Sequence, residues 1–156
     1  MSRTLKFRAW HFKLKRMFSA EEMAQDQMAL LPTGCFANIS STDVRLSQIY
    51  SHEIMLPLQF TGLLDVKGKE IYEGDILKGT SYLYGYQLED GKQFDYEGVV
   101  EWQQQADVGL CWIVRHKDGC AWNLNQCVHR NDIDRSTGKI AGNVHENPEL
   151  LMGGTK

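Results

Sequence analysis

The chain has 156 residues, of which 42% are hydrophobic and 24% charged, so a large multi-domain enzyme and wholesale disorder are both excluded. Glycine is frequent (14) and proline rare (3), a balance that favours short strands and tight turns over a helical bundle. The net charge of −3 hides an asymmetry, because residues 1–16 carry +6 and the remainder, with 11 basic and 20 acidic residues, carries −9.

The first predicted element is a β-hairpin. Apolar and charged residues alternate over residues 5–9, and they alternate again in the opposite phase over residues 10–14. Period two indicates strands, and the change of phase indicates a bulge or turn within residues 9–13. This pattern directs Phe7 and Trp10 toward the core and leaves a basic face exposed.

An amphipathic helix is expected next. Ser19 and Glu22 have the spacing of a capping box. Apolar residues then recur at helical spacing as far as Leu31, and residues 32–34, Pro-Thr-Gly, end the pattern. We expect a helix of about three turns, whose methionine-containing face packs on a sheet rather than forming a partner groove.

Strands and a hairpin follow. Alternation over residues 44–46 and 54–60 predicts strands, with Pro57 at an edge or irregular position. Asp65 and Gly68 have the spacing of a type I turn followed by a left-handed glycine, which is a common hairpin connection. Another strand begins after Gly74.

The next segment is predicted to form an antiparallel meander. Residues 79–85 continue the preceding strand and residues 87–95 form a solvated loop. Three tryptophans, Trp102, Trp112 and Trp122, then recur every ten residues, with turns at residues 106–109 and 117–119.

The length of the second turn decides the register. A two-residue turn pairs Trp122 with Arg115, whereas a three-residue turn pairs it with Val114. Whether the indoles share a face stays open at this point.

The C-terminal part has one clear strand, residues 139–144, after a segment without a clean period that ends at Arg135. A short helix is expected over residues 147–151, with Asn147 as its cap and Pro148 at its first position. Residues 152–156 are expected to be frayed.

Five stretches of the sequence together carry a resemblance to a known family. In chain order they are Lys6-Phe7-Arg8-Ala9-Trp10, Gln59-Phe60-Thr61-Gly62-Leu63, Lys69-Glu70-Ile71-Tyr72-Glu73-Gly74-Asp75-Ile76, Gly98-Val99-Val100-Glu101-Trp102 and Gly142-Asn143-Val144-His145-Glu146-Asn147-Pro148-Glu149-Leu150-Leu151. The ordered set closely resembles the YopX family, small proteins carried by bacteriophages, prophages and other mobile elements. The resemblance covers residues 6–151.

This resemblance implies a mainly β (α+β) protein with an N-terminal β-hairpin, one amphipathic helix and a C-terminal small SH3-like β-barrel. We expect a hairpin-helix-strand region at residues 1–58, a barrel core at 59–151 and a frayed tail at 152–156, all in one compact unit. The family carries no established catalytic residue. The strand count agrees with a barrel, since strands are expected to begin near Gly74, Gly98, Gly109, Cys120 and Lys139.

Three carboxylates close together in the sequence suggest either a catalytic or metal-binding site or a structural role in a turn. Glu70, Glu73 and Asp75 offer ligands for a metal or groups for general acid–base catalysis. Asp75, however, follows Gly74 at the entry to a strand, where its carboxylate accepts backbone amides and holds the turn. We favour the structural role.

A zinc site is not indicated. The only plausible set of ligands, His116, Cys120, Cys127 and His129, lacks the paired spacing of tetrahedral sites. We expect two buried thiols and two surface histidines instead. No P-loop, nucleophile elbow or dinucleotide fingerprint occurs, so we assign no catalytic residue, no metal and no cofactor, and the sequence gives no support for an enzyme without excluding one.

The leading candidate for binding is the basic aromatic segment, specifically Arg8, Trp10, Lys13, Lys15 and Arg16. The favoured hypothesis is a non-enzymatic binding module that contacts a protein partner or another copy of itself. Contact between copies is favoured because the N-terminal segment and the rest of the chain carry opposite charges. The alternative is nucleic-acid binding, with basic groups on phosphates and an aromatic ring stacked on bases. The −9 charge of the remaining chain disfavours that alternative.

The expected location is the cytoplasm of a bacterial host. No apolar run of seven or more residues follows the basic start, so neither a secretion signal nor a transmembrane span is expected, and no membrane association. The chain is too large to need disulfide staples. Reduced thiols are therefore expected at all four cysteines, Cys35, Cys111, Cys120 and Cys127.

Overall fold

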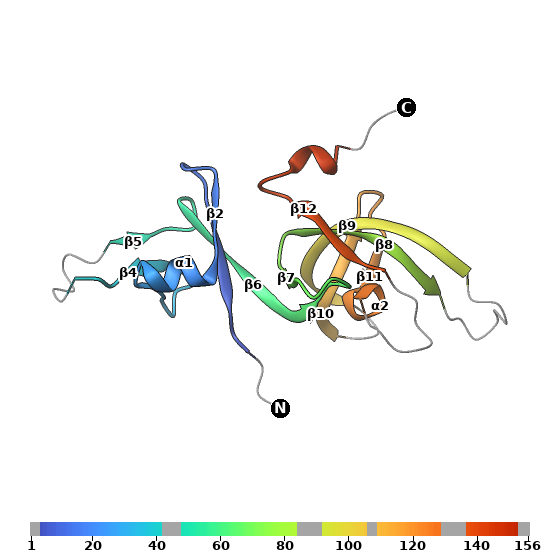
Figure 1. Ribbon diagram of the computed structural model, residues 1–156, viewed down its shortest axis with the longest axis horizontal. Helices are drawn as coiled ribbons and strands as arrows, with labels where there is room; N and C mark the ends of the chain where they lie inside the picture. Colours follow the sequence, from blue (N-terminus) through green and yellow to red (C-terminus); the bar gives the residue numbers. More distant parts are fainter. Residues whose placement is uncertain (1–3, 42–47, 84–91, 106–108, 129–136, 153–156) are drawn as a thin grey trace. The chain divides into compact units, whose positions relative to one another are not determined.

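The protein is mainly β. The computed structural model describes residues 4–41, 48–83, 92–105, 109–128 and 137–152 (Figure 1), and within these ranges strands predominate over two short α-helices and one 3₁₀ helix. No helix in these ranges has the length and apolar character needed to cross a bilayer. The chain divides into two compact units, Met1–Phe60 and Thr61–Lys156.

The first unit begins with the predicted hairpin of β1 (Phe7–His11) and β2 (Arg16–Phe18). Its turn occupies residues 12–15, later than the expected 9–13. The apolar pattern changes phase at Ala9 and Trp10 for another reason. The two residues point to opposite faces of β1, and both are buried because β1 is covered on both faces at this position.

The predicted capping box is confirmed at α1 (Ala20–Gln25), because the Ser19 hydroxyl accepts from the Glu22 amide at 3.1 Å and Glu22 accepts from the Ser19 amide at 2.8 Å. The three-turn length is wrong. Gln27 adopts a φ of 52°, and the next residues form β3 (Met28–Leu30).

The residues expected to stop the helix instead turn the chain from β3 into β4 (Phe36–Asn38). The Leu31 amide donates to the Cys35 carbonyl at 2.8 Å across this turn. β3 gains its backbone hydrogen bonds from β4, and this pairing between strands overrides the helical spacing of the apolar residues.

β5 (Ile49–Tyr50) completes a three-stranded sheet in the order β3-β4-β5. The strand predicted over residues 54–60 is confirmed by β6 (Met55–Leu64), whose first half pairs with β1 and sets Pro57 opposite Ala9. The strand predicted over residues 44–46 lies outside the described residues. The core of the unit is formed by Ala9, Met23, Phe36 and Met55.

The second unit is built on a five-stranded antiparallel sheet in the order β11-β10-β9-β8-β12. Its strands, which match the five expected ones, are β8 (Asp75–Leu83), β9 (Lys92–Gln105), β10 (Gly109–His116), β11 (Ala121–Asn123) and β12 (Lys139–Asn143). The loop expected at residues 87–95 is wrong for 92–95, because the start of β9 pairs with the end of β8. Residues 87–91 lie outside the described ranges.

The tryptophan register is decided by the turn between β10 and β11. The His116 amide donates to the Cys120 carbonyl at 2.8 Å, which encloses three residues and pairs Trp122 with Val114. Trp112 pairs with Trp102, and their rings lie 4.9 Å apart. All three indoles therefore share one face of the sheet.

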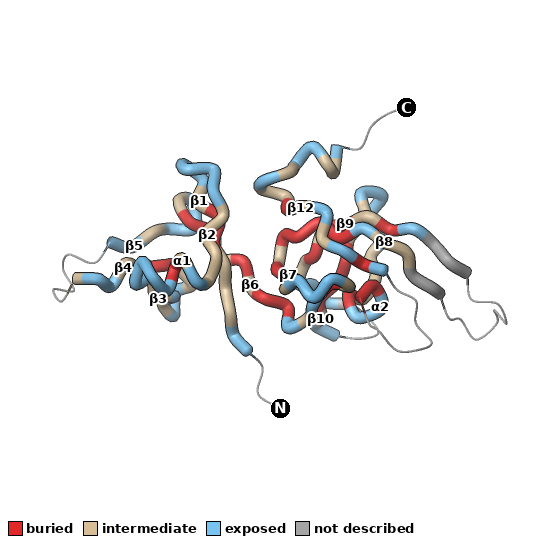
Figure 2. The backbone as a smooth tube through the Cα atoms, in the orientation of Figure 1, coloured by how far each residue is buried: buried red, intermediate tan, exposed pale blue. Residues whose placement is uncertain are grey.

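That face is mostly interior rather than an aromatic platform. Trp112 is buried, Trp122 is half-buried and Trp102 is 43% exposed. The short helix α2 (Leu124–Val128), which the sequence did not indicate, buries Leu124, Cys127 and Val128 in the same core. Figure 2 shows the buried backbone of this unit concentrated on its sheet strands and α2.

The C-terminal helix is confirmed as a single 3₁₀ turn, η2 (Pro148–Leu150), with proline at its start. The Asn147 side chain does not cap it. The Asn147 amide oxygen instead accepts from the Asn143 backbone amide at 3.3 Å, so the side chain fastens the helix to the end of β12.

The predicted turn between β6 and β7 (Glu70–Tyr72) is confirmed, with Gly68 at a φ of 83°. Asp65 is only 6% exposed. Its Oδ1 accepts from the amides of Lys67 (2.8 Å) and Lys69 (2.9 Å), and its Oδ2 accepts from the amide of Ile140 in β12 (3.1 Å). One carboxylate thus holds the turn and ties it to β12.

We expect Asp65→Ala to lower the free energy of unfolding by about 2–4 kcal/mol, because three backbone amides lose a charged acceptor in a buried place. Urea unfolding measures the change. Asp118→Ala is the matched control, since Asp118 is exposed and accepts from one backbone amide, that of Cys120. A cost no larger than that of the control would contradict this role for Asp65.

The same interaction predicts a pH dependence. Burial raises the pKa of Asp65, but the backbone amides that it accepts outweigh burial and hold the pKa below its ordinary value. Ionised Asp65 therefore stabilises the fold above about pH 4, and this stability is lost as the pH falls through the folded-state pKa. Asp65→Asn should flatten the decline in stability between neutral and acidic pH, measured by urea unfolding across that range.

Candidate functional site

The carboxylates near Gly74 hold backbone and other side chains. Asp75 is almost fully buried, and its Oδ2 accepts from the Tyr72 amide at 2.8 Å. Its Oδ1 lies 3.4 Å from the Asn143 side-chain nitrogen, and Glu70 accepts from the Tyr72 hydroxyl at 2.8 Å. The structural role predicted for Asp75 is confirmed.

Two of the five stretches that carry the resemblance meet at this point. The Gly74 carbonyl accepts from the Val144 amide at 2.9 Å, next to the contact of Asp75 with Asn143. Gly142 has no room for a side chain, because a Cβ there would lie 2.6 Å from the Asn147 side-chain oxygen. The residues of these two stretches therefore contact each other and stabilise the fold.

The cysteine and histidine residues do not gather. Cys127 is buried as expected, whereas Cys120, also expected to be buried, is exposed because it ends the β10–β11 turn. His116 is half-buried beside Asp118, and His129 lies outside the described residues. Within the described ranges, no three His, Cys, Asp or Glu side chains are grouped to hold a metal ion.

The five candidate binding residues occupy two different environments. Arg8 and Trp10 lie within β1, where Arg8 is half-buried and Trp10 is 6% exposed. Lys13 and Lys15 are exposed in the hairpin turn, and Arg16 is exposed at the start of β2. The basic segment is therefore split between core and tip.

Helix α1 neutralises part of the basic segment. Glu21 lies 2.9 Å from the Lys6 ammonium, and Glu22 pairs with Arg16. The hydrogen bond from Lys6 holds the pKa of Glu21 below its ordinary value. Arg16 also lies over the Phe18 ring at 4.6 Å. The turn lysines, 13 and 15, have no ion pair among the described residues.

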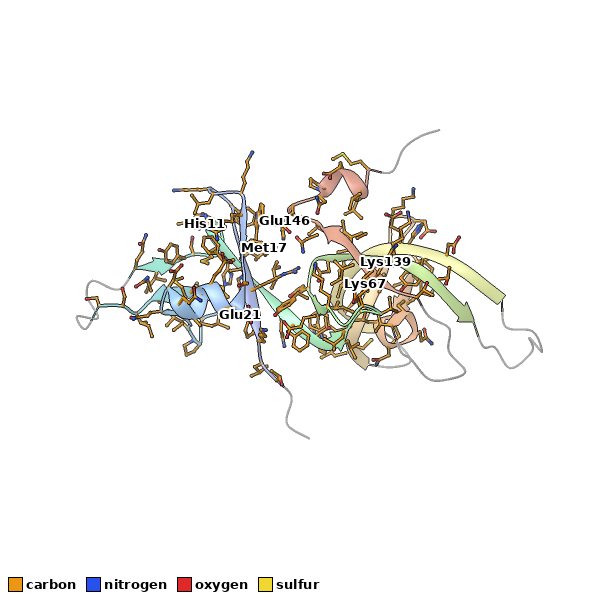
Figure 3. All side chains as sticks on the ribbon, viewed as in Figure 1. His11, Met17, Glu21, Lys67, Lys139 and Glu146 are labelled. Carbon is orange, nitrogen blue, oxygen red and sulfur yellow. The ribbon has the colours of Figure 1, made fainter. Side chains whose placement is uncertain are left out.

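A pocket of about 240 Å³ opens beside this turn, and we call it the hairpin pocket. Three rings approach one another in it, with His11 lying 6.2 Å from Phe18 and 6.3 Å from Tyr50; Figure 3 labels His11 at the hairpin. The lining residues are His11, Leu14, Phe18, Asp26, Met28, Asn38, Tyr50 and Met55.

Some polar groups of the hairpin pocket already have hydrogen-bond partners within the protein. His11 Nδ1 accepts from the Leu14 amide at 3.3 Å, which leaves Nε2 as the N–H of a neutral ring. The Asn38 side chain donates to the Asp26 carbonyl at 3.0 Å. The exposed Asp26 carboxylate remains at the wall as an acceptor.

This arrangement suits recognition more than reaction. Rings and thioethers share the concave surface with polar groups, among which Asp26 could orient a guest, as polar groups in binding pockets commonly do. Sequence reasoning found the segment containing His11 but missed Phe18, Asp26 and Tyr50. Those residues come together only because β2, α1 and β5 converge, and no local pattern signals that.

Comparisons with known proteins concern the fold and the family. The family described as YopX protein matches residues 6–152. A crystal structure of protein EF1440 from Enterococcus faecalis is similar, with a TM-score of 0.54 and 23% identity, covering 96% of this chain and 99% of that chain. At that identity the likeness concerns the fold alone. No curated protein matches the sequence.

Two of the three thiols of the second unit, Cys120 and Cys127, are expected to differ in reactivity. Burial raises the pKa of Cys127 to about 12, so its thiol stays protonated and inaccessible at pH 8. Cys120 is exposed, and although the neighbouring Asp118 raises its pKa, iodoacetamide reaches it. Mass spectrometry after brief alkylation should show modification of Cys120 well before Cys127, and equal rates would contradict the placement of Cys127 in the core.

Proposed function

The chain belongs to the YopX protein family, and on this premise we propose that it is a non-enzymatic binding module that contacts a protein partner through the hairpin pocket. The observation that carries the proposal is a ring-lined pocket, with both apolar and polar walls, beside an exposed basic turn. Buried anchors seated in such pockets supply most of the energy of many protein interfaces.

The size and chemistry of the pocket indicate its guest. About 240 Å³ accommodates one large apolar or aromatic side chain. Leu14, 62% exposed, stands at the rim, where it would cover a guest side chain. Asp26 offers an acceptor for a polar group at the edge of that side chain, whereas the Asn38 side-chain oxygen already accepts from the Ser40 amide and hydroxyl.

The charge around the pocket indicates what flanks this guest. Lys13 and Lys15 are exposed at the hairpin turn, so Asp or Glu residues beside the anchor would be attracted to them. A second copy of this chain meets that description, since residues 17–156 carry −9. Self-association and binding of an acidic partner thus rest on the same surface.

The second unit would be the supporting scaffold. We propose that its five-stranded sheet forms a small SH3-like barrel, supported by the antiparallel strand order and by the attachment of β12 to the β6–β7 turn. In keeping with the family resemblance, we propose an accessory protein of a phage or prophage that acts in the cytoplasm of the bacterial host.

A second candidate function, nucleic-acid binding, has one observation in its favour. Phe12 is 40% exposed and is followed in the same turn by Lys13 and Lys15. A partly exposed ring beside two cations is suited to a single strand. Phe12 would take the role first considered for Trp10, which is buried.

Selection of a random peptide library on the full chain tests the protein-binding proposal. We expect enriched peptides with one apolar or aromatic anchor flanked by Asp or Glu. Leu14→Glu should weaken their binding at least tenfold, since a carboxylate at the rim opposes both features. Fluorescence anisotropy with a selected peptide measures the affinity.

Leu110→Glu is the matched control, because Leu110 is equally exposed but belongs to the second unit. Failure to enrich any motif, or equal losses from both variants, would contradict the proposal. Light scattering across protein concentration at low salt tests the self-association part, which a constant monomer mass would exclude.

Anisotropy with labelled single-stranded oligonucleotides at low salt tests the second candidate. If it holds, Phe12→Ala and the pair Lys13→Gln with Lys15→Gln each weaken binding several-fold, and the lysine pair also reduces the salt dependence. Lys117→Gln, in the exposed β10–β11 turn, should have no effect. The absence of binding, or identical behaviour of all variants, would exclude this function.

A further inference from the structure

The second unit contains a larger cavity that the proposed function does not use. It has a volume of about 520 Å³ and lies over β8 and β12, with Val66 of the β6–β7 turn as one wall. We call it the β8–β12 groove. Its lining residues are Val66, Lys78, Gly79, Thr80, Asp95, Tyr96, Thr137 and Lys139.

One end of the groove is cationic because of strand register. Lys139 lies directly opposite Lys78 in the antiparallel pairing of β12 with β8. Cβ atoms of such a pair lie about 5 Å apart, and like charges in this position are destabilising. Register, which the buried faces of both strands impose, therefore places two lysines opposite each other at a cost.

Glu97 offsets one of the two charges, because it lies opposite Lys78 in the pairing of β8 with β9 and 3.7 Å from the Lys78 ammonium. Lys139 has no ion pair among the described residues. Lys67 adds a further cation, because the Val66 amide donates to the Gly138 carbonyl at 3.0 Å and so brings the turn beside Lys139; Figure 3 labels both lysines on this unit.

The other end of the groove offers hydroxyls and a carboxylate. The Thr80 and Thr137 hydroxyl oxygens lie 2.9 Å apart, and Thr137 also accepts from the Thr80 amide at 2.9 Å. Asp95 lies opposite Thr80 in the pairing of β8 with β9. Thr80 is two residues beyond Lys78, so the two ends are separated by about 7 Å.

We propose that the β8–β12 groove binds a small phosphate monoester that carries free hydroxyl groups, with the phosphate between Lys78 and Lys139 and a hydroxyl donating to Asp95. A phosphate monoester near pH 7 carries close to two negative charges, which matches two opposed lysines better than a single carboxylate does. Inorganic phosphate alone would leave most of the volume empty and would gain nothing from Asp95.

Nuclear magnetic resonance titration of the full chain with ribose 5-phosphate tests this proposal, with ribose and inorganic phosphate as separate arms. We expect shift changes at residues 78–80 and 137–139 and an affinity for ribose 5-phosphate at least tenfold above that for either fragment. Lys139→Gln should weaken ribose 5-phosphate binding at least tenfold. Lys117→Gln, which removes one charge from an exposed turn of the same unit, should not.

Asp95→Asn distinguishes the role of the carboxylate. If Asp95 accepts a ligand hydroxyl, this variant weakens ribose 5-phosphate binding while binding of inorganic phosphate is unchanged or tightened. If Asp95 only repels the phosphate, both ligands bind more tightly, and the hydroxyl contact is refuted. Leu14→Glu in the hairpin pocket should leave ribose 5-phosphate binding unchanged, so this test is independent of the proposed protein-binding function.

Thermal unfolding supplies a second readout. Lys139→Gln should raise the Tm in phosphate-free buffer, because it removes the repulsion across β8 and β12, and ribose 5-phosphate should raise the Tm of the unaltered chain but not of this variant. Unchanged spectra at millimolar ribose 5-phosphate, equal binding of ribose, or equal losses from Lys117→Gln and Lys139→Gln would each overturn the proposal.

Discussion

The Asp65 carboxylate is the interaction on which the second unit most depends. β12 is an edge strand of the five-stranded sheet, reached only through its pairing with β8. Asp65 accepts from the Ile140 amide while holding its own turn closed, so the far side of β12 is satisfied without another strand. The β8–β12 groove has Val66 as a wall for the same reason.

The stretches that carry the family resemblance form this scaffold. Two of those stretches are joined where the Asn143 side chain donates to Asp75 and the Val144 amide donates to the Gly74 carbonyl. The residues that line the hairpin pocket and the β8–β12 groove all lie outside the five stretches. A chain can therefore keep the fold of the family while its cavities change, and membership alone does not identify a ligand.

The folded structure distributes charge differently from what the charge along the sequence indicates. The basic first segment is partly offset within its own unit, because α1 places Glu21 and Glu22 against Lys6 and Arg16, and the charge that remains is concentrated at the hairpin turn. The acidic remainder of the chain in turn contains a local cationic end, where register opposes Lys78 and Lys139. Net charge predicts neither feature, since each depends on which side chains the fold brings together.

The sequence by itself determined the elements whose hydrogen bonds join residues close in the chain. The capping box at Ser19 and the Asp65–Gly68 turn span three residues each, and the five strands of the second unit are visible through alternation and their turns. Tertiary structure alone decided features that depend on pairing and packing between elements. β3 replaced the end of a predicted helix because β4 pairs with it, the start of β9 replaced a predicted loop because β8 pairs with it, and both cavities arise where separate elements converge. The spacing of apolar residues within one segment predicts hydrogen bonds inside that segment, whereas pairing between strands gains its energy from a partner segment that this spacing does not identify.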